Sequence, residues 1–180
     1  SKKIKSLWWI CSKENTLMKR VVFETNTWVG SYLRVRDEWE KITCTYKEEE
    51  IWNDSITSIK ELETEIKDFN IMVNIFKKLW LEQKSYQETY REIWKINNEI
   101  EIMINLWPGL NLYVEKEWKN EYVVRKYSEL LWFDYSKWIF GSSFKIYELE
   151  LGIDFEKINN LEQITFNNIE EIKNLWGTVQ

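Results

Sequence analysis

Two short segments alternate strictly between apolar and polar residues, which is the pattern of a β-strand with one buried face. In Tyr32–Asp37, Arg34 and Arg36 fall on the face opposite the apolar residues. Lys41–Lys47 alternates in the same way, and Asp37–Lys41 between the two segments has the length of a hairpin connection. The residues that share the polar face of the second segment are Thr43, Thr45 and Lys47. The pattern predicts two antiparallel strands.

Other segments rich in β-branched and aromatic residues predict further strands. They are Met18–Thr25, Tyr86–Trp94, Glu99–Trp107, Leu112–Glu117 and, more briefly, Phe144–Tyr147. Asn97 and Asn98 favour a turn between the second and third of these. Ser58–Ile66 fits an extended strand or a helix equally well on local propensity.

Apolar residues spaced by three and four predict helices over Asn70–Leu81, Asn120–Trp132 and Ile169–Trp176. Residues 1–12 have the pattern of the end of a helix. Strands followed by helices in this order indicate an α+β fold built around an antiparallel β-meander or barrel. With no internal repeat or linker, we expect residues 1–180 to form a single domain.

The composition excludes several classes of function. The net charge of −5 argues against general nucleic-acid binding, and no apolar run is long enough to span a membrane. We therefore expect a cytoplasmic protein. The absence of histidine excludes Ser-His-Asp and Cys-His catalysis, and two cysteines are too few for a zinc site. A metal site would have to use carboxylates, which suit Mg²⁺ or Mn²⁺.

Charged residues two positions apart share a strand face in three places. Arg34 and Arg36 present two guanidinium groups, and guanidinium binds phosphate oxygens through paired hydrogen bonds. Glu61 and Glu63 form one carboxylate pair and Glu115 and Glu117 another. Each group alone is also compatible with an ordinary solvated face. In one small barrel, however, basic and acidic strands could line opposed walls that hold phosphates and a cation.

The order of motifs resembles the CYTH family, the triphosphate-binding tunnel enzymes. The segments that carry the resemblance are Tyr32–Lys47, Lys60–Phe69, Tyr86–Trp94, Ile102–Trp118 and Ser128–Tyr147. The family fold is an antiparallel β-tunnel flanked by helices. Its members include class IV adenylyl cyclases, thiamine triphosphatases and inorganic triphosphatases.

The resemblance implies a role for each matching position. The implied phosphate ligands are Arg34, Arg36, Lys47 and Arg91. The implied ligands of Mg²⁺ or Mn²⁺ are Glu61, Glu63, Glu115 and Glu117. The implied chemistry is attack on a phosphoryl group, by water in a triphosphate hydrolase or by a ribose hydroxyl in an adenylate cyclase.

The chain departs from the family pattern at several positions. The Glu-x-Glu-x-Lys strand at the start of the family is not found, and the opening residues resemble the helix that follows it. Asn105 stands where the family usually carries an aspartate, so a metal ligand is weakened. Tryptophan replaces glycine, which would supply positive φ or a helix end, at four positions. They are Trp39, Trp80, Trp118 and Trp132.

The sequence thus predicts a divalent-metal-dependent enzyme acting on a triphosphate such as ATP, tripolyphosphate or thiamine triphosphate. One alternative is a phosphate-binding module on the same fold without catalytic activity. Another is a helical interaction protein that uses its tryptophans for contact. The sequence does not identify the triphosphate, separate hydrolase from cyclase, or give the oligomeric state.

Overall fold

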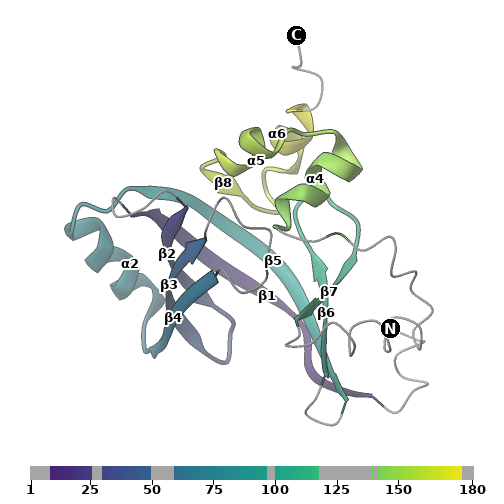
Figure 1. Ribbon diagram of the computed structural model, residues 1–180, viewed down its shortest axis with the longest axis horizontal. Coiled ribbons are helices and arrows are strands. Elements are labelled where there is room, and N and C mark those ends of the chain that lie inside the picture. The colour runs from purple at the N-terminus through teal and green to yellow at the C-terminus, as the bar shows by residue number, and fades with distance from the viewer. Residues whose placement is uncertain are drawn as a thin grey trace.

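An antiparallel sheet dominates the computed structural model, which describes residues 9–25, 30–49, 59–96, 100–117, 139 and 142–175 (Figure 1). Its strands are β1 (Ile10–Glu24), β2 (Ser31–Asp37), β3 (Ile42–Glu49), β4 (Ile59–Ile66), β5 (Gln83–Ile96), β6 (Ile100–Leu106) and β7 (Tyr113–Glu117). They lie in the order β4-β3-β2-β1-β5-β6-β7, and the short β8 (Gln163–Ile164) pairs with β5 in parallel. The α+β class with an antiparallel sheet is confirmed, and a mainly helical protein is excluded.

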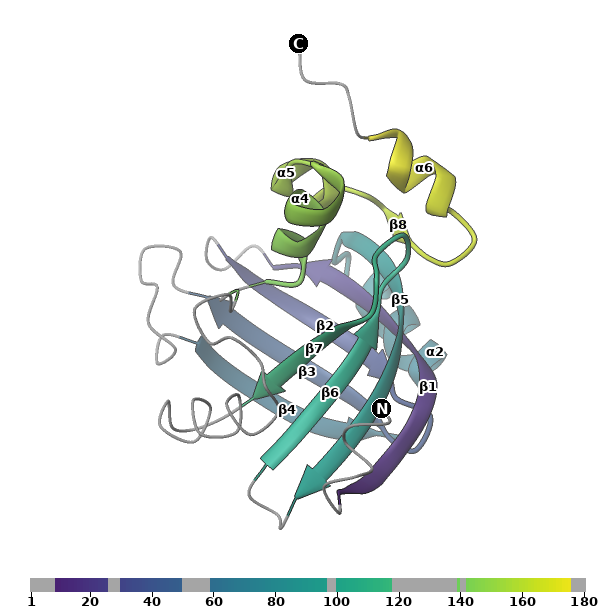
Figure 2. The same cartoon turned by 90° about the vertical axis from the view of Figure 1, so that its right-hand side faces the viewer.

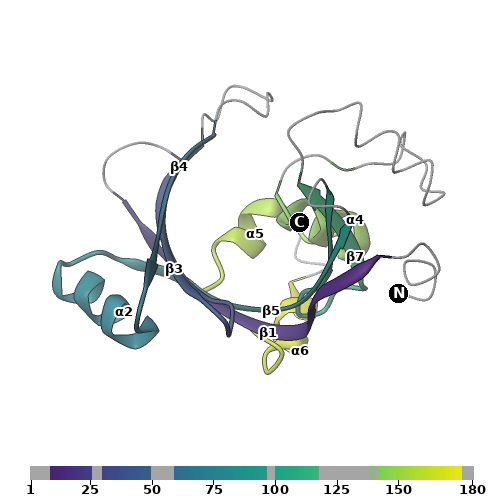
Figure 3. The same ribbon diagram turned by 90° about the horizontal axis from the view of Figure 1, so that it is seen from below.

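The sheet curves strongly, with β4 and β7 at its two edges (Figures 2 and 3). Among the described strands these two edges do not pair with each other, so the described part of the sheet is an open half-barrel. Strands twist because of backbone chirality, and the twist accumulates from strand to strand across the sheet. Register shifts between β1 and β5, at Cys11/Lys13 and Lys13/Thr16, add local bends.

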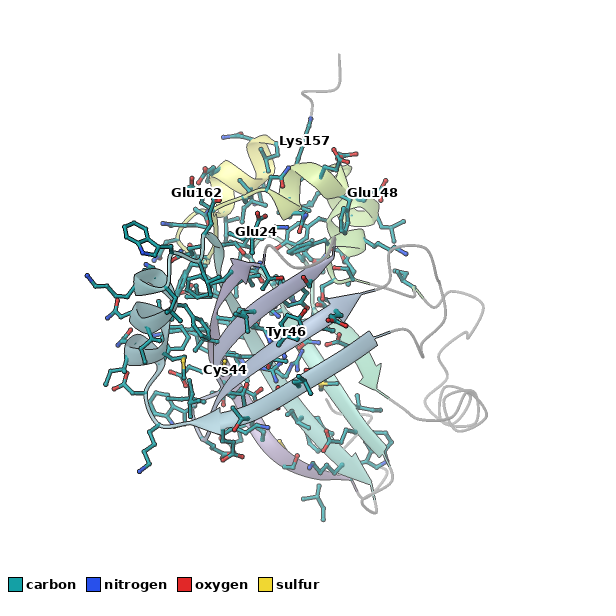
Figure 4. The ribbon with its side chains drawn as sticks, turned by 60° about the vertical axis from the view of Figure 1, so that its left-hand side comes forward. Glu24, Cys44, Tyr46, Glu148, Lys157 and Glu162 are labelled. Atoms are coloured by element: carbon teal, nitrogen blue, oxygen red, sulfur yellow. The ribbon has the colours of Figure 1, made fainter. Side chains whose placement is uncertain are left out.

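Helix α2 (Phe69–Lys78) covers the convex side of the sheet (Figure 3). Its Val73 packs with Val21, Phe23 and Val35 in one buried cluster. Since side chains alternate along a strand, the residues between these apolar ones face the concave side. Arg20, Arg34 and Arg36 therefore point into the curve of the sheet. Figure 4 labels Cys44 and Tyr46 on β3, which alternate with Thr43 and Thr45 of the concave face.

The C-terminal residues form a small helical unit at one end of the sheet (Figures 1 and 2). It contains α4 (Phe144–Leu151), α5 (Phe155–Asn159), β8 and α6 (Ile169–Asn174). Its core includes Tyr147, Ile158 and Ile172, which pack with Trp107 from the turn after β6. The Tyr147 hydroxyl donates a hydrogen bond of 2.8 Å to the carbonyl of Pro108 in the same turn. The β6–β7 turn is thereby fixed against the helical unit.

Most predicted elements are confirmed, and two are wrong. Phe144–Tyr147 begins helix α4 instead of forming a strand, because Tyr147 is buried against Trp107 and Gly152 ends the helix with a φ of 64°. Residues 10–12 belong to strand β1, so a helix does not reach them. Ser58–Ile66 is resolved as strand β4 over Ile59–Ile66. The helix expected over Asn120–Trp132 and the turn at residues 97–98 lie outside the described residues.

Two of the tryptophans at expected glycine positions have a left-handed backbone. Trp39 has a φ of 73° in the β2–β3 hairpin, and Trp80 has a φ of 63° after α2. They are the non-glycine residues with positive φ in the described part of the chain. L-residues adopt this conformation at a cost, as glycine does not. Trp118 and Trp132 lie outside the described residues. In the described part of the chain, no helix is long and apolar enough to cross a membrane.

Candidate functional site on the concave face

Arg34 on β2 is held by side chains of the two neighbouring strands. Its register partner Thr45 on β3 faces Glu63 on β4, so the three lie in one cross-strand row. Arg34 Nη2 lies 3.3 Å from the Thr45 hydroxyl, 3.4 Å from Oε1 of Glu61 and 3.7 Å from Oε2 of Glu63. The Thr45 hydroxyl donates a 2.8 Å hydrogen bond to Glu63. These contacts orient the guanidinium and leave Arg34 only 8% exposed.

Arg36 lies two residues further along β2 and pairs with a different carboxylate. It forms an ion pair with Glu38, whose residue is 7% exposed, and lies 4.0 Å from Glu63. The Lys13 ammonium of β1 donates a hydrogen bond to the backbone carbonyl of Glu38 and lies 3.9 Å from the Glu38 carboxylate. Burial lowers the pKa of Arg36, and the charge of Arg34 lowers it further. The two arginines are therefore held close together against their mutual repulsion.

Arg91 occupies the other wall, on β5, and belongs to a closed hydrogen-bonded group with β6 and β7. Arg91 Nε donates to the side-chain carbonyl of Asn105 at 2.7 Å, and Arg91 Nη2 donates to Oε2 of Glu115 at 2.9 Å. Asn105 Nδ2 donates to the same Glu115 oxygen at 2.9 Å. Asn105 is fully buried, so each of its polar groups needs the partner it has.

Arg20 on β1 lies at the bottom of the concave face, between the two walls. Its register partners are Arg36 on β2 and Gln87 on β5. Its guanidinium carbon lies 4.3 Å from the centre of the Trp107 ring, within the range of a cation–π contact. Burial lowers the pKa of Arg20, and the charges of Arg34, Arg36 and Arg91 lower it further.

The structure thus brings the predicted residues together in two groups, one on each wall. Arg34 and Arg36 share a wall with Glu61 and Glu63, whereas Arg91 shares the other with Glu115. The hypothesis that one wall is basic and the other acidic is not what the structure shows, because each wall pairs arginine with glutamate. The remaining predicted residues are Lys47, which lies beside Glu61 in register, and Glu117, whose side chain lies outside the described residues.

Three contributors to the site were not predicted from the sequence. They are Arg20, Thr45 and Glu38. Arg20 could have been found from the alternation of Met18–Thr25, which places it opposite Val21 and Phe23. Thr45 carries no such signal, since a threonine on a strand is common. Glu38 can be assigned to the site only once the structure shows its ion pairs with Lys13 and Arg36.

Carboxylates on the concave face have the chemistry of ligands for a hard divalent cation, but they are not gathered in one place. Within the described ranges, no group of three or more Asp, Glu, Cys or His side chains is placed to hold a metal ion. Glu61 and Glu63 share one face of β4, and Mg²⁺ is often bound by only one or two carboxylates together with substrate phosphates. Both carboxylates also lie close to Arg34 Nη2, at 3.4 Å and 3.7 Å, so a cation here would have to share them with that arginine.

The comparison with protein families matches a model described as the CYTH domain to residues 28–172. This covers most of the chain, which therefore belongs to the CYTH family. The comparison with curated proteins found no match.

Solved structures with the same fold include proteins of Pyrococcus and Vibrio. A conserved hypothetical protein of Pyrococcus furiosus superimposes with a TM-score of 0.64 at 18% identity, covering 81% of this chain and 90% of that one. A protein of Pyrococcus horikoshii OT3 superimposes with a TM-score of 0.56 at 22% identity, covering 75% of this chain and 84% of that one. A candidate adenylate cyclase of Vibrio parahaemolyticus gives 0.61 at 15% identity, covering 81% and 87%. At these identities the similarity establishes the fold.

Proposed function

We propose that the concave face binds a small molecule carrying a triphosphate and that the protein acts on it with a divalent cation. The observation that carries the proposal is the convergence of arginines from both walls on one face of the sheet. Guanidinium groups recognise phosphate oxygens with charge-assisted, directional hydrogen bonds. A triphosphate is long and highly charged enough to engage several of them at once.

Donor groups on the β2 wall support the proposal. The Nε atoms of Arg34 and Arg36 are buried and make no hydrogen bond with the described residues. The hydroxyl of Thr43, next to them on β3, is also buried and has no hydrogen-bond partner among the described residues. Buried donors without an acceptor are costly, and a phosphate group would supply acceptors to all of them.

The second part of the proposal, a divalent cation, depends on the carboxylates of the concave face. Glu61 and Glu63 are the residues that would hold a divalent cation beside Arg34, with Glu115 and Glu117 as the corresponding pair on the β7 wall. A bound cation would neutralise charge on the phosphoryl oxygens as it develops during phosphoryl transfer. The arginines would orient the phosphate chain, and the glutamates now paired with them would have to release one oxygen to the cation.

A phosphate-binding module without turnover is the second candidate. The hydrogen bonds that join Arg91, Asn105 and Glu115 favour it. Arg91 and the amide of Asn105 both donate to Oε2 of Glu115, so that oxygen is already neutralised within the protein. A carboxylate whose charge is compensated by a neighbouring arginine attracts a divalent cation less strongly. The two candidates share a ligand and differ in the chemistry that follows.

Calorimetry and activity assays on the full chain test both candidates. Tripolyphosphate should bind, and phosphate release or cyclic nucleotide formation should be measured with tripolyphosphate, ATP and thiamine triphosphate. Turnover with Mg²⁺ that stops with a chelator supports the enzyme. Binding without turnover under any of these conditions supports the module. If tripolyphosphate does not bind, the proposed function is wrong.

A further inference from the structure

Arg20 differs from the other arginines of the concave face in its partners. Arg34, Arg36 and Arg91 each form an ion pair with a glutamate. Among the described residues Arg20 has no carboxylate within ion-pairing distance. Its close neighbour is instead the ring of Trp107, which is itself buried and fixed by the C-terminal helical unit.

The surroundings of Arg20 make its charge unfavourable in the protein alone. The charge is desolvated, and the charged groups that repel it are the three other arginines. A desolvated charge is tolerated when an opposite charge or a set of hydrogen bonds compensates it. A cation–π contact with Trp107 offsets only part of this cost.

The position of Arg20 is also central. Its register partner on one side is Arg36, and its partner on the other side is Gln87 of β5, the strand that carries Arg91 four residues later. The contact with Trp107 holds the guanidinium beside a ring that is itself buried and fixed. A ligand that contacts both Arg36 and Arg91 must pass Arg20.

We infer that Arg20 is a phosphate-binding residue that bridges the two walls and supplies an uncompensated positive charge for an oligophosphate. The inference rests on the proposed function and adds to it a residue that the family resemblance does not supply. It also assigns a role to Trp107, which positions the guanidinium without touching the ligand.

The test compares tripolyphosphate affinity and thermal stability in Arg20→Gln, Arg20→Lys and a control, Lys19→Gln. Lys19→Gln removes the same net charge as Arg20→Gln. Lys19 is exposed on the same strand and faces the opposite side of the sheet, so it cannot contact a ligand on the concave face. Arg20→Gln should weaken tripolyphosphate binding about 10- to 100-fold, the equivalent of one or two charge-assisted hydrogen bonds. Lys19→Gln should change it less than about threefold, as expected for screened charge.

Stability separates a binding role from a structural one. Because Arg20 is repelled by its neighbours, the melting temperature of Arg20→Gln without ligand should stay the same or rise while its affinity falls. Arg20→Lys keeps the charge without the planar fork, and should bind with intermediate affinity.

The outcomes distinguish this inference from the proposed function. Wild-type affinity in Arg20→Gln, with weakened binding in Arg34→Gln, overturns the role of Arg20 and leaves the phosphate site standing. A melting temperature that falls with the affinity in both Arg20 variants makes the residue structural and also overturns the inference. If the unmodified protein does not bind tripolyphosphate, the proposed function and the inference fail together.

Discussion

Arg91 and Glu115 face each other across the intervening strand β6, joined by a 2.9 Å hydrogen bond from Nη2 to Oε2. The amide of Asn105, between them on β6, donates to the same oxygen and accepts from Arg91 Nε. One carboxylate oxygen is thereby compensated twice by protein donors. Under the proposed function, the neutral amide at residue 105 lowers the negative charge that this wall offers to a cation.

Asn105→Asp should make the stability of the protein depend on a divalent cation. An aspartate would place a second carboxylate about 3 Å from that of Glu115, and the single charge of Arg91 would then face two negative charges that repel each other. We expect a lower melting temperature without metal and an increase on adding Mg²⁺ that the unmodified protein lacks. Thermal unfolding with and without Mg²⁺ measures both effects.

Asn111→Asp is the matched control for this experiment. Asn111 Nδ2 donates to Oε2 of Glu150 at 3.1 Å, but both residues are exposed to solvent. Water screens the new repulsion there, so the melting temperature should change little and Mg²⁺ should have no specific effect. A similar response to Mg²⁺ in both variants would contradict the assignment of residue 105 to a cation-binding wall.

The sequence predicts the strands of this sheet better than it predicts the site. Alternation identifies β2 and β3 because one face of each is buried and a shift of one residue would expose the apolar side. Phe144–Tyr147 has strand-forming residues, yet it is helical because Tyr147 packs with Trp107, 40 positions earlier. Local propensity cannot anticipate a contact made at that separation.

The site residues on β2 follow from the Arg-x-Arg spacing, but their partners do not. Spacing places Arg34 and Arg36 on one face, and strand pairing then decides that Glu61 and Glu63 lie against Arg34. Arg20 is hidden in a segment that otherwise predicts a core strand. Its importance comes from the register with Arg36 and Gln87, which only the assembled sheet provides.

Thr45→Val should destabilise the protein, whereas Thr43→Val should not. Both threonines are fully buried on the same face of β3. The Thr45 hydroxyl connects Arg34 with Glu63, so its loss leaves two charged groups short of a partner, at a cost of about 1–3 kcal/mol. The Thr43 hydroxyl has no hydrogen-bond partner among the described residues, so a methyl group should be neutral or stabilising.

Urea unfolding of the two valine variants measures the free-energy changes directly. The difference between the two variants is the informative result, because the size, shape and burial of the two residues are matched. Equal destabilisation by both substitutions would mean that the hydroxyl of Thr45 does not organise the Arg34 contacts.

Trp39→Gly and Trp80→Gly should each stabilise the protein by about 1 kcal/mol. Both residues have positive φ, which costs an L-residue roughly 1–2 kcal/mol and costs glycine little. They are 82% and 92% exposed, so removing the rings loses little buried surface. The gain is reduced by the greater freedom of glycine in the unfolded chain.

Leu79→Gly is the control for the tryptophan substitutions. Leu79 directly precedes Trp80 and is 65% exposed, but its φ is −84°. Glycine gains nothing from that conformation and should destabilise the protein by about 0.5–1 kcal/mol. Chemical denaturation measures all three variants, and destabilisation by both tryptophan substitutions would contradict the account of their backbone strain.

The most direct test of the phosphate site is the affinity of Arg34→Gln and Arg36→Gln for tripolyphosphate, measured by calorimetry beside Lys19→Gln. Each arginine variant should lose about 1–3 kcal/mol of binding free energy, the range for hydrogen bonds to charged groups. Lys19→Gln, on the convex face, should bind like the unmodified protein. Unchanged affinity in both arginine variants would contradict the assignment of the concave face as the triphosphate site.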